Sequence, residues 1–135
     1  MGRIEDKRKE IEKYLEELRA IVPKTIEEYA TNIEKKAACE RYIEKIVEAA
    51  IDLAFLIIKS NKLRIPEDDG DAFTILSENN IIASSLATKL RNAKGMKNII
   101  AHQYGKIDDE IIFEALSGQL EKDVMEFIES IKEKK

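Results

Sequence analysis

A short stretch in the last third of the chain, residues 95–108, gathers side chains suited to acid–base chemistry on a phosphate. It contains the only histidine among 135 residues, His102. Lys97 precedes this histidine by five residues, Asn98 precedes it by four, and Tyr104 follows it by two. Imidazole exchanges protons near neutral pH, and a neighbouring ammonium offsets charge that builds on phosphorus. The combination would suit metal-free RNA cleavage, in which a 2′-hydroxyl attacks the adjacent phosphate.

On a regular helix, His102 would share a face with Asn98 but not with Lys97. Asn98 and His102 lie about 400° apart in rotation and share a face, whereas Lys97 and His102 diverge by about 140°. Lys97 and His102 can meet over one phosphate only if the helix ends or distorts near Ala101, or if a second copy of the chain supplies one of them. A two-fold dimer would also present two histidines, which completes an acid–base pair.

Structural interpretations compete with this chemistry. A lone histidine near a helix end often caps carbonyls or packs through its ring, and Tyr104 can be a half-buried aromatic side chain. Asp52 shares a partly charged face, and Cys39 has no second ligand or nearby base. A basic cluster next to the histidine is otherwise typical of a solvated helix face: Lys89, Arg91, Lys94 and Lys97. The sequence has no CxxC, HExxH, glycine-rich phosphate loop or nucleophile elbow, so we expect no metal and no cofactor.

Composition limits the class of protein. The chain is 44% apolar and 37% charged, with only five Gly and two Pro, which favours long helices over a turn-rich sheet. Its length predicts one domain over residues 1–135. A net charge of −4 argues against a general nucleic-acid coat. The single cysteine, the charged N-terminus and the absence of a long apolar run predict a cytoplasmic protein that neither crosses a membrane nor carries a secretory signal.

The apolar pattern predicts an all-α, up-and-down bundle of five to six helices. A first helix spans about residues 4–21 and ends before Pro23. Thr25 is expected to cap a short second helix. The longest helix spans about residues 32–60, and a loop follows over residues 61–71.

The second half of the chain predicts two further long helices. Ser84 is the expected cap of the first, and Gly95 should introduce a kink or a close approach by another backbone. Asp108 is the expected N-cap of a single final helix, with Ile107 and Ile112 forming a hydrophobic staple. One stripe of that helix should face inward: Leu116, Leu120, Val124, Phe127 and Ile131.

The residues around the histidine resemble a known family. Residues 95–104, Gly-Met-Lys-Asn-Ile-Ile-Ala-His-Gln-Tyr, are similar to the signature of HepT-like toxins of the HEPN superfamily. In that signature an arginine is followed after four residues by a histidine, then by any residue and a tyrosine. The likeness extends through residues 49–52 and 71–76, and in pattern covers roughly residues 41–127.

The resemblance implies a single HepT-like HEPN domain that forms a homodimer, with a cleft at the two-fold axis, and acts as a metal-independent endoribonuclease toxin. By position, His102 would transfer protons, Lys97 would take the place of the arginine, and Asn98 would orient the site. Tyr104 matches the tyrosine that a partner nucleotidyltransferase antitoxin modifies with AMP. Such an adduct, two residues from His102, would obstruct the cleft and repel RNA.

Lys97 departs from the family pattern. Lysine keeps the positive charge but lacks the planar fork with which arginine grips a phosphate. The departure leaves three readings open: an active ribonuclease, a weakened or inactive helical dimer that binds its antitoxin partner or RNA without cleaving it, and a plain bundle with no cleft. Arg91 could substitute only if a kink at Gly95 swings it towards His102.

Overall fold

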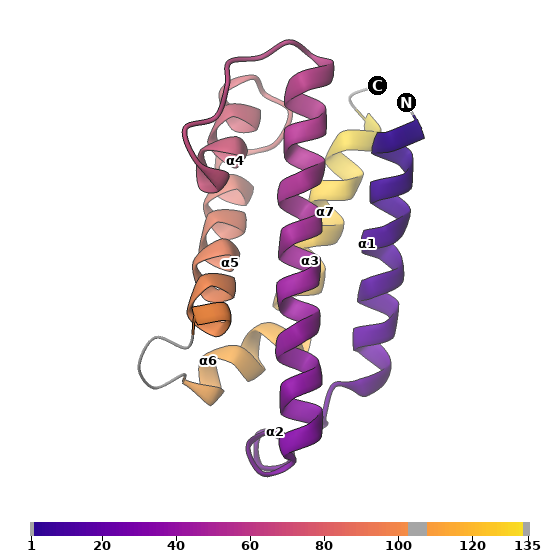
Figure 1. The fold of residues 1–135 in the computed structure, drawn as a ribbon, viewed down its shortest axis with the longest axis vertical. Coiled ribbons are helices and arrows are strands. Elements are labelled where there is room, and N and C mark those ends of the chain that lie inside the picture. Colours follow the sequence, from indigo (N-terminus) through magenta and orange to yellow (C-terminus); the bar gives the residue numbers. More distant parts are fainter. Residues whose placement is uncertain (1, 103–107, 134–135) are drawn as a thin grey trace.

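The computed structural model describes residues 2–102 and 108–133, and over these ranges it contains helices joined by turns and loops, with no strand. The elements in chain order are α1 (Gly2–Ile21), α2 (Ile26–Thr31), α3 (Ile33–Ser60), α4 (Asp69–Glu78), α5 (Ser84–His102), α6 (Asp109–Glu114), the π-helical segment η1 (Ala115–Gln119) and α7 (Leu120–Glu133). The four long helices α1, α3, α5 and α7 alternate in direction (Figure 1). The predicted all-α, up-and-down bundle is confirmed for the described residues.

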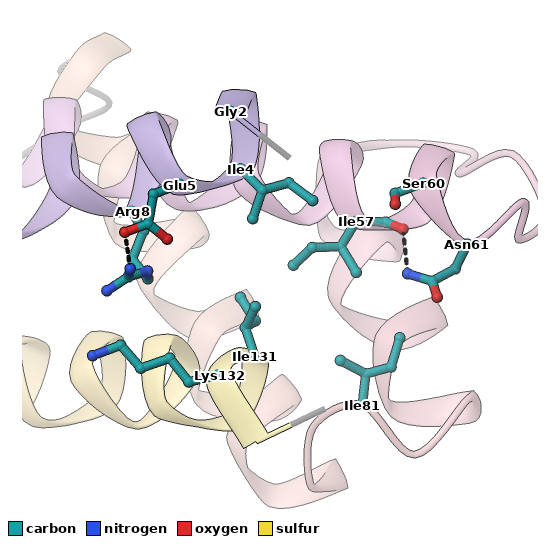
Figure 2. A pocket seen from close by; sticks show the side chains of 10 residues that line it. All are labelled: Gly2, Ile4, Glu5, Arg8, Ile57, Ser60, Asn61, Ile81, Ile131 and Lys132. Atoms are coloured by element: carbon teal, nitrogen blue, oxygen red, sulfur yellow. Dashed lines mark hydrogen bonds and ion pairs between the residues drawn. The ribbon is translucent and has the colours of Figure 1, made fainter. Parts of the chain in front are cut away.

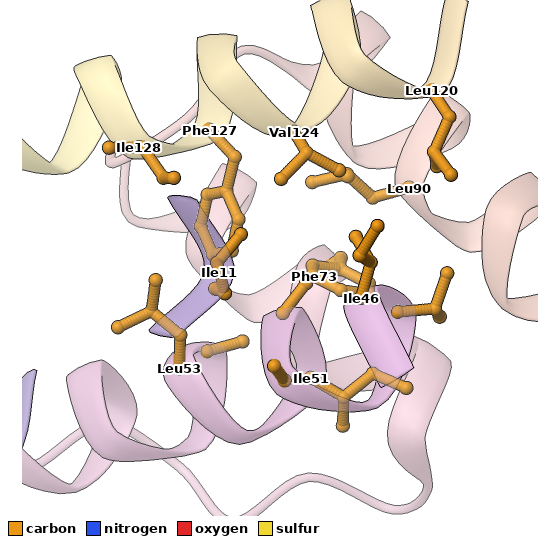
Figure 3. Packing of buried hydrophobic residues seen from close by; sticks show 14 of the residues in the cluster. Ile11, Ile46, Ile51, Leu53, Phe73, Leu90, Leu120, Val124, Phe127 and Ile128 are labelled. Atoms are coloured by element: carbon orange, nitrogen blue, oxygen red, sulfur yellow. The ribbon is translucent and has the colours of Figure 1, made fainter. Parts of the chain in front are cut away.

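Helix α3 is the central element of the bundle. It packs against α1 on one side and against α4 and α5 on the other, and α7 packs against α5 behind it, while α2 and α6 lie at the end opposite the two termini (Figure 1). Its apolar stripe packs into a core in which Ile46 and Leu53 are fully buried. Phe73 of α4 meets Phe127 of α7 edge to face, with ring centroids 5.8 Å apart (Figure 3). The core therefore joins three segments that are distant in sequence.

Side-chain caps place most helix starts where the sequence predicts them. The Thr25 hydroxyl accepts a hydrogen bond from the Glu28 amide at 3.1 Å, and α2 begins one residue later. Asn32 ends α2 and also caps α3. Asp68 accepts a hydrogen bond from the Asp71 amide at 2.8 Å, so α4 begins inside the predicted loop. These caps satisfy amides that have no partner within their own helix.

Two predictions for the second half of the chain are wrong. Ser84 is the first residue of α5, not its cap, and the Ala87 amide donates to the carbonyl of Ala83. Helix α5 also passes through Gly95 without interruption. A Cβ added to Gly95 would meet nothing within 4 Å, so within the described chain no other backbone approaches closely there. Gly95 therefore imposes only the modest cost of glycine in a helix.

The predicted final helix is broken in two. Asp108 does cap it, because its carboxylate accepts hydrogen bonds from the Glu110 and Ile111 amides. Gly118, however, has φ +139° and ψ −20°, which ends the first part and redirects the chain into α7. Ile131 of the predicted inward stripe is partly buried. The other four residues of the stripe are buried: Leu116, Leu120, Val124 and Phe127. Of the proposed staple, Ile112 is buried and Ile107 lies outside the described residues.

Within residues 2–102 and 108–133, no helix has both the length and the apolar character needed to cross a bilayer.

Candidate active site at the end of helix α5

Helix α5 carries three of the predicted site residues on a frame anchored in the core. Its Leu86, Ala87, Leu90 and Ile100 are buried, which fixes the rotation of the helix about its axis. The helix ends at His102, whose side chain is exposed. A histidine in the last turn also suits the negative end of the helix dipole when it is protonated. The ring is therefore displayed at the surface and not sealed in the bundle.

Asn98 and His102 share one face of α5, as the sequence predicts, because the helix stays regular through both positions. Asn98 is half-buried and lies about 6 Å along the axis from His102. An amide at this spacing can donate to or accept from a group bound beside the imidazole.

Lys97 lies on a different side of α5. It follows Leu90 by seven residues and Ala93 by four, so it falls on the side of the helix that faces the core. Its side chain is half-buried, in keeping with an aliphatic stem that packs while the ammonium reaches towards water. Since the helix includes Ala101 and His102, Lys97 and His102 diverge by about 140° within one chain. Helix α5 is continuous up to His102, so no end or distortion before His102 brings the two side chains together.

Tyr104 lies outside the described residues, within the segment 103–107 that joins α5 to α6. The two ends of this segment are described: His102 ends α5 and Asp108 caps α6.

Arg91 cannot replace Lys97. Its guanidinium donates to the Thr74 hydroxyl at 2.8 Å and to the Thr88 hydroxyl at 3.2 Å, so it is tied to α4. It precedes His102 by eleven residues, about 16 Å along an unbroken helix. With no kink at Gly95, Arg91 stays far from the candidate site.

Helix α5 is a local positive surface on an acidic protein. Its sequence contains several cations and no Asp or Glu. Within the part of the chain that the structure describes, Lys89, Lys94 and Lys97 form no ion pair with a carboxylate. Cations that are not neutralised by a carboxylate can attract a phosphate backbone to this helix. No group of three His, Cys, Asp or Glu able to hold a metal ion lies among the described residues.

A cavity of about 710 Å³ lies elsewhere, at the end of the bundle where α1 begins and α7 ends, opposite the end of α5 (Figures 1 and 2). Ile4, Ile57, Ile81 and Ile131 surround its centre, with the paired Glu5 and Arg8 to one side (Figure 2). No residue of the candidate site contributes to it.

The sequence is similar to those of known nucleases. The sequence profile described as Ribonuclease HepT-like matches residues 11–131. The mRNA nuclease HepT of Shewanella oneidensis is 34% identical over 90 residues, which are 67% of each chain. The tRNA nuclease HepT of Aphanizomenon flos-aquae is 28% identical over 119 residues, which are 88% of this chain and 81% of that one.

A solved structure extends the likeness to the fold. The tri-AMPylated HEPN toxin of Shewanella oneidensis, in complex with an MNT antitoxin, superposes with a TM-score of 0.89 at 26% identity, and the match covers 96% of both chains. The family profile spans nearly the whole of the described bundle and includes helix α5 with its histidine. This chain belongs to the HepT-like ribonuclease family.

Proposed function

We propose that this chain is a ribonuclease toxin that cleaves RNA without a metal ion, in a cleft shared by two copies of a single domain spanning residues 1–135. The observation that carries the proposal is the exposed His102 at the end of an unbroken, cationic helix. Its relatives are named as nucleases of mRNA and tRNA. We propose the cytoplasm as the place of action, because RNA substrates and the partner antitoxin would be found there.

The geometry of α5 supports a site made of two copies. Within one chain, Lys97 and His102 point about 140° apart and cannot hold the same phosphate. A second chain related by a two-fold axis would place its own cation and imidazole opposite the first. The shared cleft would then contain two histidines, which is what general acid and general base catalysis needs.

In this cleft one His102 would take the proton of the 2′-hydroxyl as its oxygen attacks the adjacent phosphorus. The His102 of the second copy would give a proton to the departing 5′-oxygen. The phosphorus–oxygen bond to the 5′ side breaks, leaving a 2′,3′-cyclic phosphate and a 5′-hydroxyl. Lys97 would offset the charge on the phosphate oxygens, and Asn98, on the same face as His102, would orient the bound group.

We further propose that a nucleotidyltransferase antitoxin silences the toxin by transferring AMP to Tyr104. The similar toxin of Shewanella oneidensis is tri-AMPylated and bound to an MNT antitoxin. An added AMP brings bulk and negative charge two residues from His102, which would block the cleft and repel RNA.

A second candidate function is supported by Lys97. An ammonium binds a phosphate as a point charge and lacks the two-pronged grip of a guanidinium. If that grip is essential, the chain is a weakened or inactive dimer that binds its antitoxin or RNA without cleaving.

RNA cleavage by matched variants separates these possibilities. Purified wild-type protein should cleave total RNA in the presence of EDTA, and His102→Ala should not. Lys97→Ala should slow cleavage, while Lys89→Ala, which removes a cation near the other end of the same helix, should have little effect. Lys97→Arg distinguishes the two functions: cleavage that appears only in this variant identifies a degraded enzyme. Equal cleavage by wild type and His102→Ala would reject the site.

Mass spectrometry tests the silencing. Co-expression with a nucleotidyltransferase encoded beside the toxin should add one or more AMP masses to the intact protein, and Tyr104→Phe should remove them. An unmodified wild-type chain would reject this part of the proposal.

A further inference from the structure

Helix α5 carries a row of polar side chains on the side that bears His102. Asn98 precedes the histidine by four residues, Lys94 by eight and Arg91 by eleven. On a regular helix these three side chains lie within about 80° of the histidine in rotation, and about 6, 12 and 16 Å from it along the axis. The row therefore runs from the proposed reaction centre back along α5, towards the part of the helix that packs beside α4 (Figure 1).

The two cations of this row keep their charge available to an anion. Lys94 is half-buried, and within residues 2–102 and 108–133 it forms no ion pair with a carboxylate. Arg91 forms none in the same ranges, and its guanidinium donates instead to the hydroxyls of Thr74 and Thr88. A hydroxyl accepts a hydrogen bond without cancelling the charge of the guanidinium. Charges that no carboxylate neutralises attract a phosphate.

Arg91 is already fixed in place. Its Cγ and Cδ atoms lie 3.8 Å from the position that a Cβ on the buried Gly70 would take, so the stem packs against the first turn of α4. Asp68 lies at the same turn, but its carboxylate caps α4 through the Asp71 amide at 2.8 Å and forms no ion pair with Arg91. A guanidinium has more N–H donors than the two bonds to threonine use. Because the side chain is ordered beforehand, binding a phosphate would cost it little conformational entropy.

Lys89 is a cation of the same helix that lies outside the row. It precedes His102 by thirteen residues, which turns its side chain about 140° away from the histidine. Like Lys94, it forms no ion pair with a carboxylate among the residues that the structure describes. Net charge alone would make these two lysines equivalent, whereas the rotation of α5 makes them different.

We infer that Lys94 and Arg91 bind phosphates of the RNA strand on one side of the cleaved bond, so that α5 acts as a track for single-stranded RNA. The inference rests on the proposed ribonuclease function and deepens it by naming the substrate, a strand of several nucleotides. At about 3.4 Å per stacked nucleotide, the distances from His102 to Lys94 and Arg91 correspond to roughly three to five nucleotides. Both side chains contact the backbone and read no base, so the track accepts different sequences.

The test measures binding of a labelled 2′-O-methyl RNA, whose blocked 2′-oxygen cannot attack the phosphate. A strand of about ten nucleotides covers the whole track. Lys94→Gln and Arg91→Gln should each reduce the slope of log Kd against log salt by about 0.7, the value for one lost phosphate contact on a single strand. Each should also weaken binding by about threefold or more at low salt. Lys89→Gln is the matched control, because it removes the same charge from another side of α5, and it should keep the wild-type slope.

Strand length separates a phosphate contact from a structural effect. The difference between wild type and Lys94→Gln should disappear when competing strands are shortened below about four nucleotides, which cannot reach from His102 to Lys94. Equal weakening for short and long strands would mean that the substitution disturbs the fold, and it would overturn the inference. Lys94→Gln breaks no hydrogen bond or ion pair of the described chain, so its result decides even if Arg91→Gln loosens α4 and lowers the melting temperature.

Two further results bear on the inference and on the proposed function separately. Equal salt slopes for Lys94→Gln and Lys89→Gln would overturn the track, because only general attraction to a cationic helix would remain. So would a wild-type protein that does not bind the longer strand. If wild type binds that strand with the expected slopes but does not cleave unmodified RNA, the track stands and the proposed catalysis is rejected.

Discussion

A shared cleft makes a quantitative prediction for mixtures of active and inactive chains. His102→Ala is a suitable inactive partner, because His102 is exposed at the end of α5 and its truncation should barely affect folding. Co-refolding the variant with wild-type protein would produce wild-type pairs, mixed pairs and variant pairs in statistical proportion. The rate per wild-type chain then reports whether one histidine is enough.

The size of the effect follows from the two roles of the histidines. In a 1:1 mixture about half of the wild-type chains have a wild-type partner, and in a 3:1 excess of variant about one quarter do. A mixed pair lacks either the acid or the base, a loss worth about 10²-fold or more, so its contribution is negligible. Cleavage per wild-type chain should therefore fall to about one half and then about one quarter.

The assay is the initial rate of cleavage of a labelled RNA at constant wild-type concentration. As a control, His102→Ala added to refolded wild type under conditions that prevent subunit exchange should leave the rate unchanged. A rate per wild-type chain that stays constant in the co-refolded mixtures would mean that each chain cleaves alone. That result would refute the proposed two-copy cleft, even if His102 itself proved essential.

Further variants test the fold and its charges. Gly95→Ala should stabilise the protein by about 0.5–1 kcal/mol in urea unfolding, because a helix interior favours alanine and the added Cβ meets nothing within 4 Å. Gly118→Ala should destabilise it by more than about 1 kcal/mol in the same assay, because φ there is +139°. Glu40→Gln should raise the melting temperature near neutral pH but not near pH 4. Burial raises the pKa of the Glu40 carboxyl in the folded protein above its ordinary 4.5, so the ionised carboxylate lowers the stability of the folded protein as pH rises through that range. An equal gain in melting temperature at both pH values would contradict this cause. Ile46→Ala should cost about 2–5 kcal/mol, because the side chain is fully buried, whereas Ile65→Ala, at a position 87% exposed, should stay within about 0.5 kcal/mol in the same titration.

Most of the fold could be predicted from the sequence because its helices have clear apolar stripes and side-chain caps. Thr25 and Asp108 cap helices by hydrogen bonds to amides two or three residues further on, and such contacts are local in sequence. The break at Gly118 could not be predicted from the apolar stripe, since the buried positions before and after it continue at nearly helical spacing. Its one signal is the glycine itself, and Gly95 gives the same signal inside an uninterrupted helix.

The sequence suggests the residue types of the candidate site and only part of its geometry. The common face of Asn98 and His102 follows from helical periodicity alone. The exposure of His102 does not, because a histidine near a helix end can also pack through its ring. The pairing of Lys36 with Asp109 joins residues 73 positions apart and has no local pattern, so only the packing of α6 against α3 reveals it. The role of Arg91 could not be decided either, because the Thr74 hydroxyl that holds it belongs to another helix.

The rotation of α5 separates Lys97 from His102 within one chain. Burial of Leu90 and Ile100 places Lys97 towards the core side of the helix and His102 on the opposite, exposed side. A chain that folds alone would therefore hold a cation and an imidazole that cannot act on the same phosphate. Catalysis would begin only when two chains meet, and AMP on Tyr104 would act at that same meeting place. Under the proposed function, one helix thus separates the reacting groups within a chain, and association combines them.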